Sequence, residues 1–340
     1  MSQTLVLGIE SSCDETAAAV VADGKKVLAS VIHTQVEEHA QWGGVVPEIA
    51  GRSHLRALRP VLEQALMDAG IVAADLAGIA VTNRPGLLGS LLIGATAAKA
   101  LAWAWEKPLV GVHHIEAHIY AALMTLEAPQ FPFITLVVSG GHTSLYRTTS
   151  PLCHELLGST RDDAAGEALD KASKMLGLGY PGGPAIQQAA VQGNPKAFPF
   201  KLPLLSRDSL EFSFSGLKTA LLYTIKGPGG KMADDWLIPQ SHLADLCASY
   251  EHAVATTLVR KCVRACQQTD IHQILVGGGV ACNKRLRTLM HMEANKVGIE
   301  AVFAPPEYCT DNAVMIAGLG FELLQRGQTA DLNLDVYARA

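Results

Sequence analysis

Apolar runs and amphipathic stretches alternate along the chain in two successive groups. Short apolar runs bounded by turn residues are typical of buried strands, and a repeat of three to four residues is typical of helices. The first half has predicted strands at 5–10, 17–22, 26–32, 77–82 and 109–113 and predicted helices at 48–69 and 90–105. The second half has predicted strands at 133–138, 143–147 and 273–276 and predicted helices at 164–176, 243–268 and from 284 and 312 onward.

The two groups open in the same way, with two apolar runs separated by a short polar turn. The turns begin at Ser11 and Ser139, about 128 residues apart. This repeat favours an α/β protein of two related lobes with a cleft between them, because a barrel would need eight evenly spaced strand–helix units. We expect an N-terminal lobe at 1–131, joined by the C-terminal helix 312–340, and a C-terminal lobe at 132–311.

Composition narrows the class of protein. The 340 residues are 49 % hydrophobic and 17 % charged with 31 glycines, which indicates a compact enzyme and excludes a disordered or fibrous chain. We identify no apolar run of membrane length and no export signal, and the seven cysteines form no Cys-x-x-Cys pair, so a reducing cytoplasm is expected. The net charge of −5 argues against a stand-alone nucleic-acid binder.

Two histidines four residues apart are the first candidate for chemistry. His114 and His118 follow the apolar run 109–113 and open a helical pattern, so both imidazoles would lie on one helix face and could reach one ion. Asp311, just before the last helical pattern, is the best third ligand, and two histidines with one carboxylate leave positions open for substrate. The spacing alone leaves open that both histidines are capping or half-buried residues.

Three glycine-rich turns in the second lobe could hold an anion. They are Ser139-Gly140-Gly141, Pro181-Gly182-Gly183-Pro184 and Gly277-Gly278-Gly279. Glycine lets backbone amides approach a phosphate closely, although any one such turn can be a simple chain reversal. The segment Ser215-Gly216-Leu217-Lys218-Thr219 does not fit the P-loop pattern. Gly277-x-Gly279 does not fit the dinucleotide fingerprint, which excludes a Rossmann dehydrogenase.

Several carboxylates and an amide have two alternative roles each. Glu167 and Asp170 would share a helix face, either to bind a ribose or to pair with nearby lysines. Asn283 could cap a helix or bind a ligand. Asp14 and Glu15 in the first turn could position a reacting group or a cation, or simply form the turn.

Seven segments in the same order resemble the universal family of tRNA N(6)-adenosine threonylcarbamoyltransferases, formerly labelled glycoproteases. They span nearly the whole chain and are Gly8-Ile9-Glu10-Ser11-Ser12-Cys13-Asp14-Glu15-Thr16, Gly43-Gly44-Val45-Val46-Pro47-Glu48, His113-His114-Ile115-Glu116-Ala117-His118, Val138-Ser139-Gly140-Gly141-His142-Thr143, Tyr180-Pro181-Gly182-Gly183-Pro184, Phe212-Ser213-Phe214-Ser215-Gly216-Leu217-Lys218-Thr219 and Cys309-Thr310-Asp311-Asn312. The chain departs from the family pattern at Arg84, where a glycine is usual.

The resemblance implies an actin-like, sugar-kinase-like (ASKHA) fold of two ribonuclease H-like lobes. It implies one divalent metal ion, iron or alternatively zinc, held by His114, His118 and Asp311. It also implies a threonylcarbamoyl-adenylate substrate held by Val137, Val138, Ser139, Gly140, Gly141, Asp170, Gly183 and Asn283. Family members transfer the threonylcarbamoyl group to the adenosine beside the anticodon in tRNAs that read codons beginning with adenine. Bacterial members work with a paralogue lacking the metal site and with a small ATPase.

Four other classes of protein are weighed against this one. A zincin metalloprotease needs a glutamate directly after its first histidine, and Glu116 lies two residues after His114, off the ligand face. An actin-like ATPase or small-molecule kinase is permitted by the fold, as is a carbamoyltransferase of small molecules. A scaffold subunit would have no need of all three proposed metal ligands.

Overall fold

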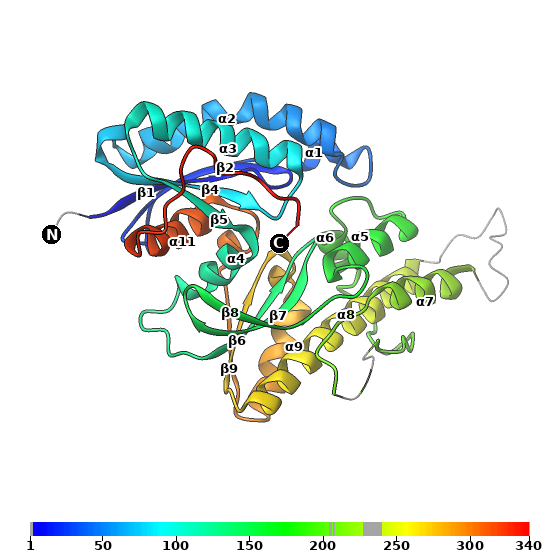
Figure 1. Cartoon of the computed structure of the whole chain (residues 1–340). Coiled ribbons are helices and arrows are strands. Elements are labelled where there is room, and N and C mark those ends of the chain that lie inside the picture. The colour runs from blue at the N-terminus through cyan, green and yellow to red at the C-terminus, as the bar shows by residue number, and fades with distance from the viewer. Residues whose placement is uncertain (1–2, 204–205, 207, 227–239, 340) are drawn as a thin grey trace. The chain divides into compact units, whose positions relative to one another are not determined.

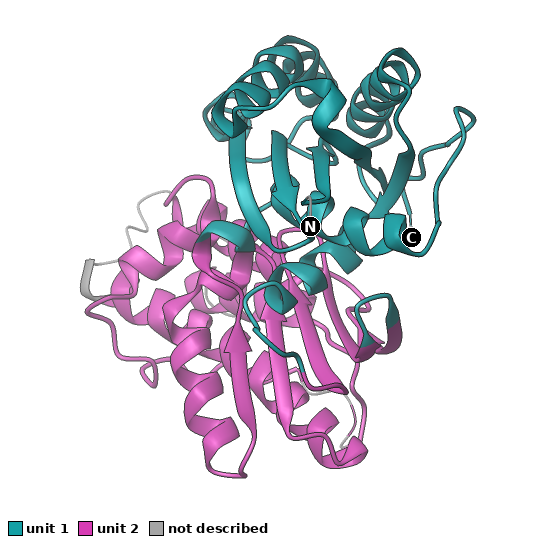
Figure 2. Cartoon of the chain, turned by 90° about the vertical axis from the view of Figure 1, so that its left-hand side faces the viewer, with its two compact units in different colours: residues 1–129, 150–153, 307–340 teal, residues 130–149, 154–306 magenta. Residues whose placement is uncertain are grey.

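The computed structural model describes residues 3–203, 206, 208–226 and 240–339. The chain divides into two compact units, drawn in teal and magenta in Figure 2. Unit 1 contains residues 1–129, 150–153 and 307–340, and unit 2 contains residues 130–149 and 154–306. The C-terminal segment therefore rejoins the N-terminal part at Glu307, a few residues before the position 312 expected from the sequence.

Unit 1 is built on a mixed five-stranded sheet. Its strands, in spatial order, are β3 (Lys26–Thr34), β2 (Glu15–Ala22), β1 (Leu5–Glu10), β4 (Leu76–Arg84) and β5 (Leu109–His113). β1 pairs antiparallel with β2 and parallel with β4. β1 is the central strand, and its residues after Leu5 are all buried.

Helices cover both faces of this sheet (Figure 1). One layer contains α2 (Pro47–Ala69) and α3 (Leu88–Trp105), and the other contains α4 (His114–Leu123) and α11 (Ala313–Gln325). A short helix, α1 (Val36–Ala40), follows β3. α11 lies very close to the sheet, since a Cβ on Gly8 would fall 2.3 Å from the carbonyl oxygen of Ala313. Only glycine at this position of β1 permits that approach.

Unit 2 has a second mixed five-stranded sheet. Its strands, in spatial order, are β8 (Cys153–Ser159), β7 (Thr143–Ser150), β6 (Phe133–Val138), β9 (Gln273–Gly277) and β10 (Glu300–Phe303). Its helices are α5 (Ala165–Leu176), α6 (Gly182–Ala189), α7 (Ser215–Lys226), α8 (Gln240–Thr269) and α9 (Lys284–Asn295), with α10 (Pro306–Cys309) at the return to unit 1. The long helix α8 packs against β6 and β9.

The two sheets have the same strand order. In each unit the first strand is central, the next two strands of the chain extend the sheet on one side, and the last two extend it on the other. In both sheets the first strand pairs antiparallel with the second and parallel with the fourth. The predicted α/β architecture of two related lobes is confirmed.

One described helix, α3, is long and apolar enough by length and composition alone to cross a membrane. No apolar run of this length was expected from the sequence, where the helix was predicted at 90–105. Six positions of α3, from Ser90 to Ala102, are buried. They pack against the sheet and α2, so α3 is a covering helix of unit 1.

Candidate metal centre and substrate loops

The two histidines of the candidate metal centre lie at the start of α4. His113 precedes this helix, and its ring Nδ1 accepts the backbone N–H of Glu116, which caps the helix N-terminus. His114 and His118 therefore follow one another on a single face of α4, and both are buried. Their rings meet edge to face with centroids 4.7 Å apart.

Asp311 reaches the same place from the loop before α11. Asn312 caps α11 by accepting the N–H of Met315 and also donates to the carbonyl oxygen of Thr310, so the loop is held on both sides of Asp311. The Asp311 Oδ1 atom lies 3.0 Å from His118 Nε2 and 3.5 Å from His114 Nε2.

One potential ligand atom from each of these three residues lies within 4.8 Å of the other two. The donor set fits a divalent ion, because two imidazoles and one carboxylate suit iron or zinc and leave coordination positions open.

A fourth side chain, that of Glu10, contacts the cluster at the Nδ1 atom of His114. Glu10 is the last residue of β1 and is fully buried. Its Oε2 atom lies 3.1 Å from His114 Nδ1 and 2.6 Å from the hydroxyl of Thr82 on β4. Its other oxygen accepts the backbone N–H of Ser12. No role for Glu10 was predicted from the sequence, although a carboxylate at the end of an otherwise apolar buried strand is a signal that could have identified it.

The carboxylates of Asp311 and Glu10 favour the charged form of His114, and His114 favours the charged forms of both carboxylates. Burial lowers the pKa of His114, but the carboxylates of Asp311 and Glu10 outweigh burial and hold this pKa well above its usual value. Burial raises the pKa of Asp311, and the charge and hydrogen bond of His114 outweigh that effect and hold it well below its usual value. The pKa of Glu10 is likewise lowered, because its interactions with His114 exceed the effect of burial.

Asp14 and Glu15 lie between β1 and β2. Glu15 is the first residue of β2, not part of the turn as expected from the sequence, and it pairs with Thr34 of β3. Burial, together with the negative charges of Asp311 and Asp14, raises the pKa of Glu15 to about 10. Cys13 is also a weak acid, because burial and the charge of Asp14 raise the pKa of its thiol well above its usual value. The thiol is therefore protonated at neutral pH and is unsuited to be a nucleophile.

The first glycine loop of unit 2 connects β6 to β7 and lies against the N-terminus of α5. Val137 and Val138 are buried strand residues, so a ligand would meet their backbone atoms and not their side chains. The carbonyl oxygens of Ser139 and Gly140 accept the N–H groups of Gly166 and Glu167 in the first turn of α5. A Cβ on Gly140 or Gly141 would meet nothing within 4 Å, so this loop is open beside its backbone amides.

Asp170 and Gly183 lie at the junction of α5 and α6. The Asp170 Oδ1 atom accepts the N–H of Gly182 at 2.7 Å, and Gly183 follows in the first turn of α6. Glu167 pairs with Lys171 at 2.8 Å, which is the ion-pair alternative considered for this carboxylate from the sequence.

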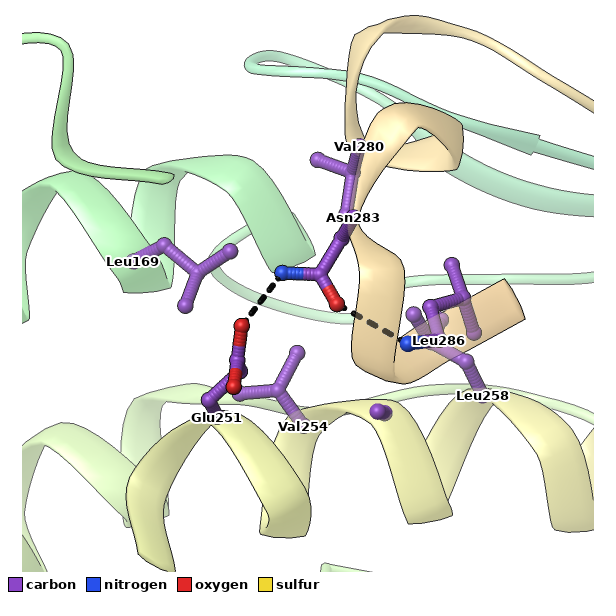
Figure 3. Close-up of a pocket in the computed structure, with 8 residues that line it drawn as sticks. Leu169, Glu251, Val254, Leu258, Val280, Asn283 and Leu286 are labelled. Carbon is purple, nitrogen blue, oxygen red and sulfur yellow. Dashed lines mark hydrogen bonds between the residues drawn. The ribbon is translucent and has the colours of Figure 1, made fainter. Parts of the chain in front are cut away.

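Asn283 caps α9 and also contacts α8 (Figure 3). Its Oδ1 atom accepts the N–H of Leu286 at 2.9 Å, and its Nδ2 donates to Glu251 at 2.7 Å. Glu251 is buried and also pairs with Arg285. Asn283 and Glu251 border a small hollow whose lining is otherwise apolar: Leu169, Val254, Ala255, Leu258, Val280 and Leu286.

Comparison with known proteins decides the family. The model of the tRNA N6-adenosine threonylcarbamoyltransferase family matches residues 26–318. A relative of that name from Syntrophotalea carbinolica is 50 % identical over 331 residues, which cover 97 % of this chain and 95 % of the relative. Another from Trichlorobacter lovleyi is 52 % identical over 336 residues, covering 98 % and 96 %. The chain belongs to this transferase family.

Solved structures of low sequence identity share the fold of this family member. HypF from T. kodakarensis superposes with a TM-score of 0.63 at 15 % identity, over 96 % of this chain and 48 % of HypF. Component A of the (R)-2-hydroxyglutaryl-CoA dehydratase of Acidaminococcus fermentans gives a TM-score of 0.54 at 13 % identity, over 94 % and 98 %. These neighbours confirm the predicted actin-like fold.

Three arginines on the helices α2 and α9 are engaged in contacts within the chain. Arg59 pairs with Glu63 on the surface of α2. Arg285 pairs with Glu251, and Arg287 lies over the ring of Phe303. Arg84 is the exposed last residue of β4.

Proposed function

We propose that this chain transfers the threonylcarbamoyl group from threonylcarbamoyl-adenylate to the exocyclic amine of the adenosine beside the anticodon in tRNAs reading ANN codons, with release of AMP. The observation that carries the proposal is the identity of about 50 % with transferases of this name over nearly their whole length. The cluster of His114, His118 and Asp311 in unit 1 supports it.

His114, His118 and Asp311 would hold a divalent metal ion, iron or alternatively zinc. When bound, such an ion offsets negative charge on the departing phosphate and orients the donor. The segment of Val137, Val138, Ser139, Gly140 and Gly141 would hold the adenylate, and the backbone N–H groups of Gly140 and Gly141 would bind its phosphate, because the open space beside these two glycines leaves room for close approach. Asp170, Gly183 and the second N–H of the Asn283 amide would contact the rest of the nucleotide.

The acceptor amine needs a base, because it loses a proton when the new bond forms. Asp14 or Glu15 would take this proton. Glu15 holds its own proton at neutral pH in the metal-free chain. A cation at the neighbouring Asp311 would favour the ionised form of Glu15, so metal binding would prepare this residue to act as the base.

We also propose a complex with a paralogue that lacks the metal site and with a small ATPase, in the cytoplasm. The outer face of α3 supports a protein partner, because Leu88, Leu92 and Trp103 expose 50 %, 51 % and 73 % of their surfaces. Large apolar side chains exposed along one helix are typical of a protein interface. The paralogue would cover this face.

The test is mass analysis of nucleosides from tRNA incubated with the chain, its partners and threonylcarbamoyl-adenylate. Wild-type protein should form threonylcarbamoyladenosine, and His114→Ala or Asp311→Ala should lose both bound metal and transfer. His33→Ala, at an exposed histidine of β3, is the matched control and should retain both. Retained transfer by the ligand variants, or ATP turnover without any tRNA product, would contradict the proposal.

A further inference from the structure

The position of Glu10 has a consequence for the proposed metal centre. This carboxylate ends the central strand of the unit 1 sheet and has none of its surface exposed. A buried carboxylate is costly unless donors satisfy both of its oxygens. Three donors from three segments do so: the N–H of Ser12 at 2.5 Å, the hydroxyl of Thr82 at 2.6 Å and the Nδ1 of His114 at 3.1 Å.

These contacts decide which nitrogen of His114 carries a proton when the ring is neutral. The backbone N–H of Ser12 can only donate, so the Oε1 atom of Glu10 accepts from it. The hydroxyl of Ser12 also lies 3.3 Å from His114 Nδ1 and can either donate or accept, so it does not fix the tautomer. The Oε2 atom of an ionised carboxylate can only accept, so the Nδ1 that lies 3.1 Å from it carries the hydrogen. The lone pair of the neutral His114 ring is then on Nε2, the atom that lies 3.5 Å from Asp311 Oδ1.

His118 has no carboxylate hydrogen-bonded to its Nδ1 among the described residues. The Nδ1 atom of His118 is buried and has no hydrogen-bond partner among the residues that the structure describes. His118 is oriented through its Nε2 contact with Asp311 and by the packing of α4. The carboxylate behind the cluster therefore acts on one of the two histidines.

We propose that Glu10 is a positioning residue for the metal centre, which holds His114 in its Nδ1–H tautomer and directs Nε2 toward the position shared with His118 and Asp311. This inference rests on the proposed metal site. Carboxylates that accept a hydrogen bond from the far nitrogen of a ligating histidine fix its orientation and raise its basicity, and their loss typically weakens metal binding by roughly 10- to 100-fold.

Glu10→Gln tests the tautomer directly, because the substitution preserves size. A glutamine has one acceptor oxygen, which the N–H of Ser12 requires, so its NH₂ group would face His114. The ring would then accept at Nδ1 and carry its proton on Nε2, where it cannot bind a metal. Thr82→Val is the matched control, because it removes a donor to the same carboxylate and leaves the imidazole contact in place.

The primary measurement is the Zn²⁺ dissociation constant of the full chain, obtained by competition with a chelator. Glu10→Gln should weaken binding by roughly 10- to 100-fold, and Thr82→Val by less than about threefold. If His114→Ala and Asp311→Ala bind Zn²⁺ as tightly as wild type, the metal site itself is wrong. If those two lose Zn²⁺ but Glu10→Gln keeps wild-type affinity, only the role of Glu10 is wrong.

A measurement on wild-type protein keeps the inference testable even if Glu10→Gln does not fold. Nitrogen-15 spectra of the Zn²⁺-loaded chain distinguish a ring protonated at Nδ1 from one protonated at Nε2, and His114→Ala assigns the signal. We expect His114 to carry its proton on Nδ1. A proton on Nε2, or Nδ1 bound to the metal, would overturn the inference.

Discussion

The elevated pKa of Glu15 makes the stability of the metal-free chain depend on pH in a defined direction. Burial and the charges of Asp311 and Asp14 raise this pKa from 4.5 to about 10. Between those values the folded chain keeps the proton and the unfolded chain releases it. The stability contributed by the protonated carboxyl is therefore fully present below pH 4.5 and is lost as the pH rises toward 10. Glu15→Gln removes this dependence, because a glutamine resembles the protonated acid and does not ionise.

The size of the effect follows from linkage. One proton held only by the folded state gives a slope of about 1.4 kcal/mol per pH unit. From pH 5.5 to pH 7.5 the upper bound is therefore about 3 kcal/mol. Because Glu15 is partly accessible to solvent, screening lowers the expected difference to roughly 1–2 kcal/mol. Glu15→Gln should be more stable than wild type, and its advantage should grow with pH over this range.

Urea unfolding followed by tryptophan fluorescence measures this difference. Trp105 packs against the core of unit 1, so its emission reports the unit that contains Glu15. The titrations are run with a chelator at several pH values, and Glu37→Gln on the exposed surface of α1 is the matched control. A difference between Glu15→Gln and wild type that stays constant from pH 5.5 to 7.5 would refute the reasoning. Adding Zn²⁺ should shrink the advantage of Glu15→Gln, because a cation beside Asp311 favours the ionised glutamate.

Three further changes test other parts of the chain. Burial raises the pKa of Asp162, but hydrogen bonds from the Ser213 hydroxyl and the N–H of Phe214 outweigh burial and lower this pKa. Asp162→Asn should therefore lower the free energy of unfolding by about 1 kcal/mol at pH 7, measured by thermal unfolding. The difference from wild type should fade as the pH drops below 4, because the wild-type carboxylate is then protonated. Trp103→Glu should abolish co-purification with the paralogue and leave the melting temperature of the isolated chain nearly unchanged, because this side chain is 73 % exposed. Gly278→Ala should lower the melting temperature and weaken binding of threonylcarbamoyl-adenylate, measured by calorimetry, because the residue has φ +93° and a Cβ would lie 2.4 Å from the carbonyl oxygen of Val138.

Most of the fold could be predicted from local pattern, and the elements that were missed have physical reasons. The central strands are continuous apolar runs, and the long helices have clear periodicity. β8 was missed because it is an edge strand with no buried residue except Gly158, and β10 because it has four residues. α6 and α7 were missed because their N-termini are capped from elsewhere, by Asp170 and Asp162. A cap supplied by a distant segment leaves no signal beside the helix that it caps.

In the candidate site, too, some features follow from the local sequence and others depend on contacts between distant segments. Helical spacing was enough to place His114 and His118 on one face. The position of Asp311 as third ligand rested on its place before the last helix and on the family resemblance, and the structure brings it to both histidines. The capping role of Asn283 followed from residue type, whereas its bond to Glu251 on α8 could not be predicted from local sequence.

The three proposed ligands lie beside helix ends that fix the backbone around them. His114 opens α4 and Asp311 immediately precedes the cap of α11, and these two helices pack against each other under the same sheet. Each helix begins at a capped end, so the backbone on either side of the cluster is fixed by hydrogen bonds within a few residues. Glycine at position 8 of β1 lets α11 approach the central strand, and β1 ends two residues later at Glu10. Strand β1 thus positions Asp311 through the packing of α11 and orients His114 through the carboxylate of Glu10. Two of the three proposed ligands therefore depend on the end of this one strand.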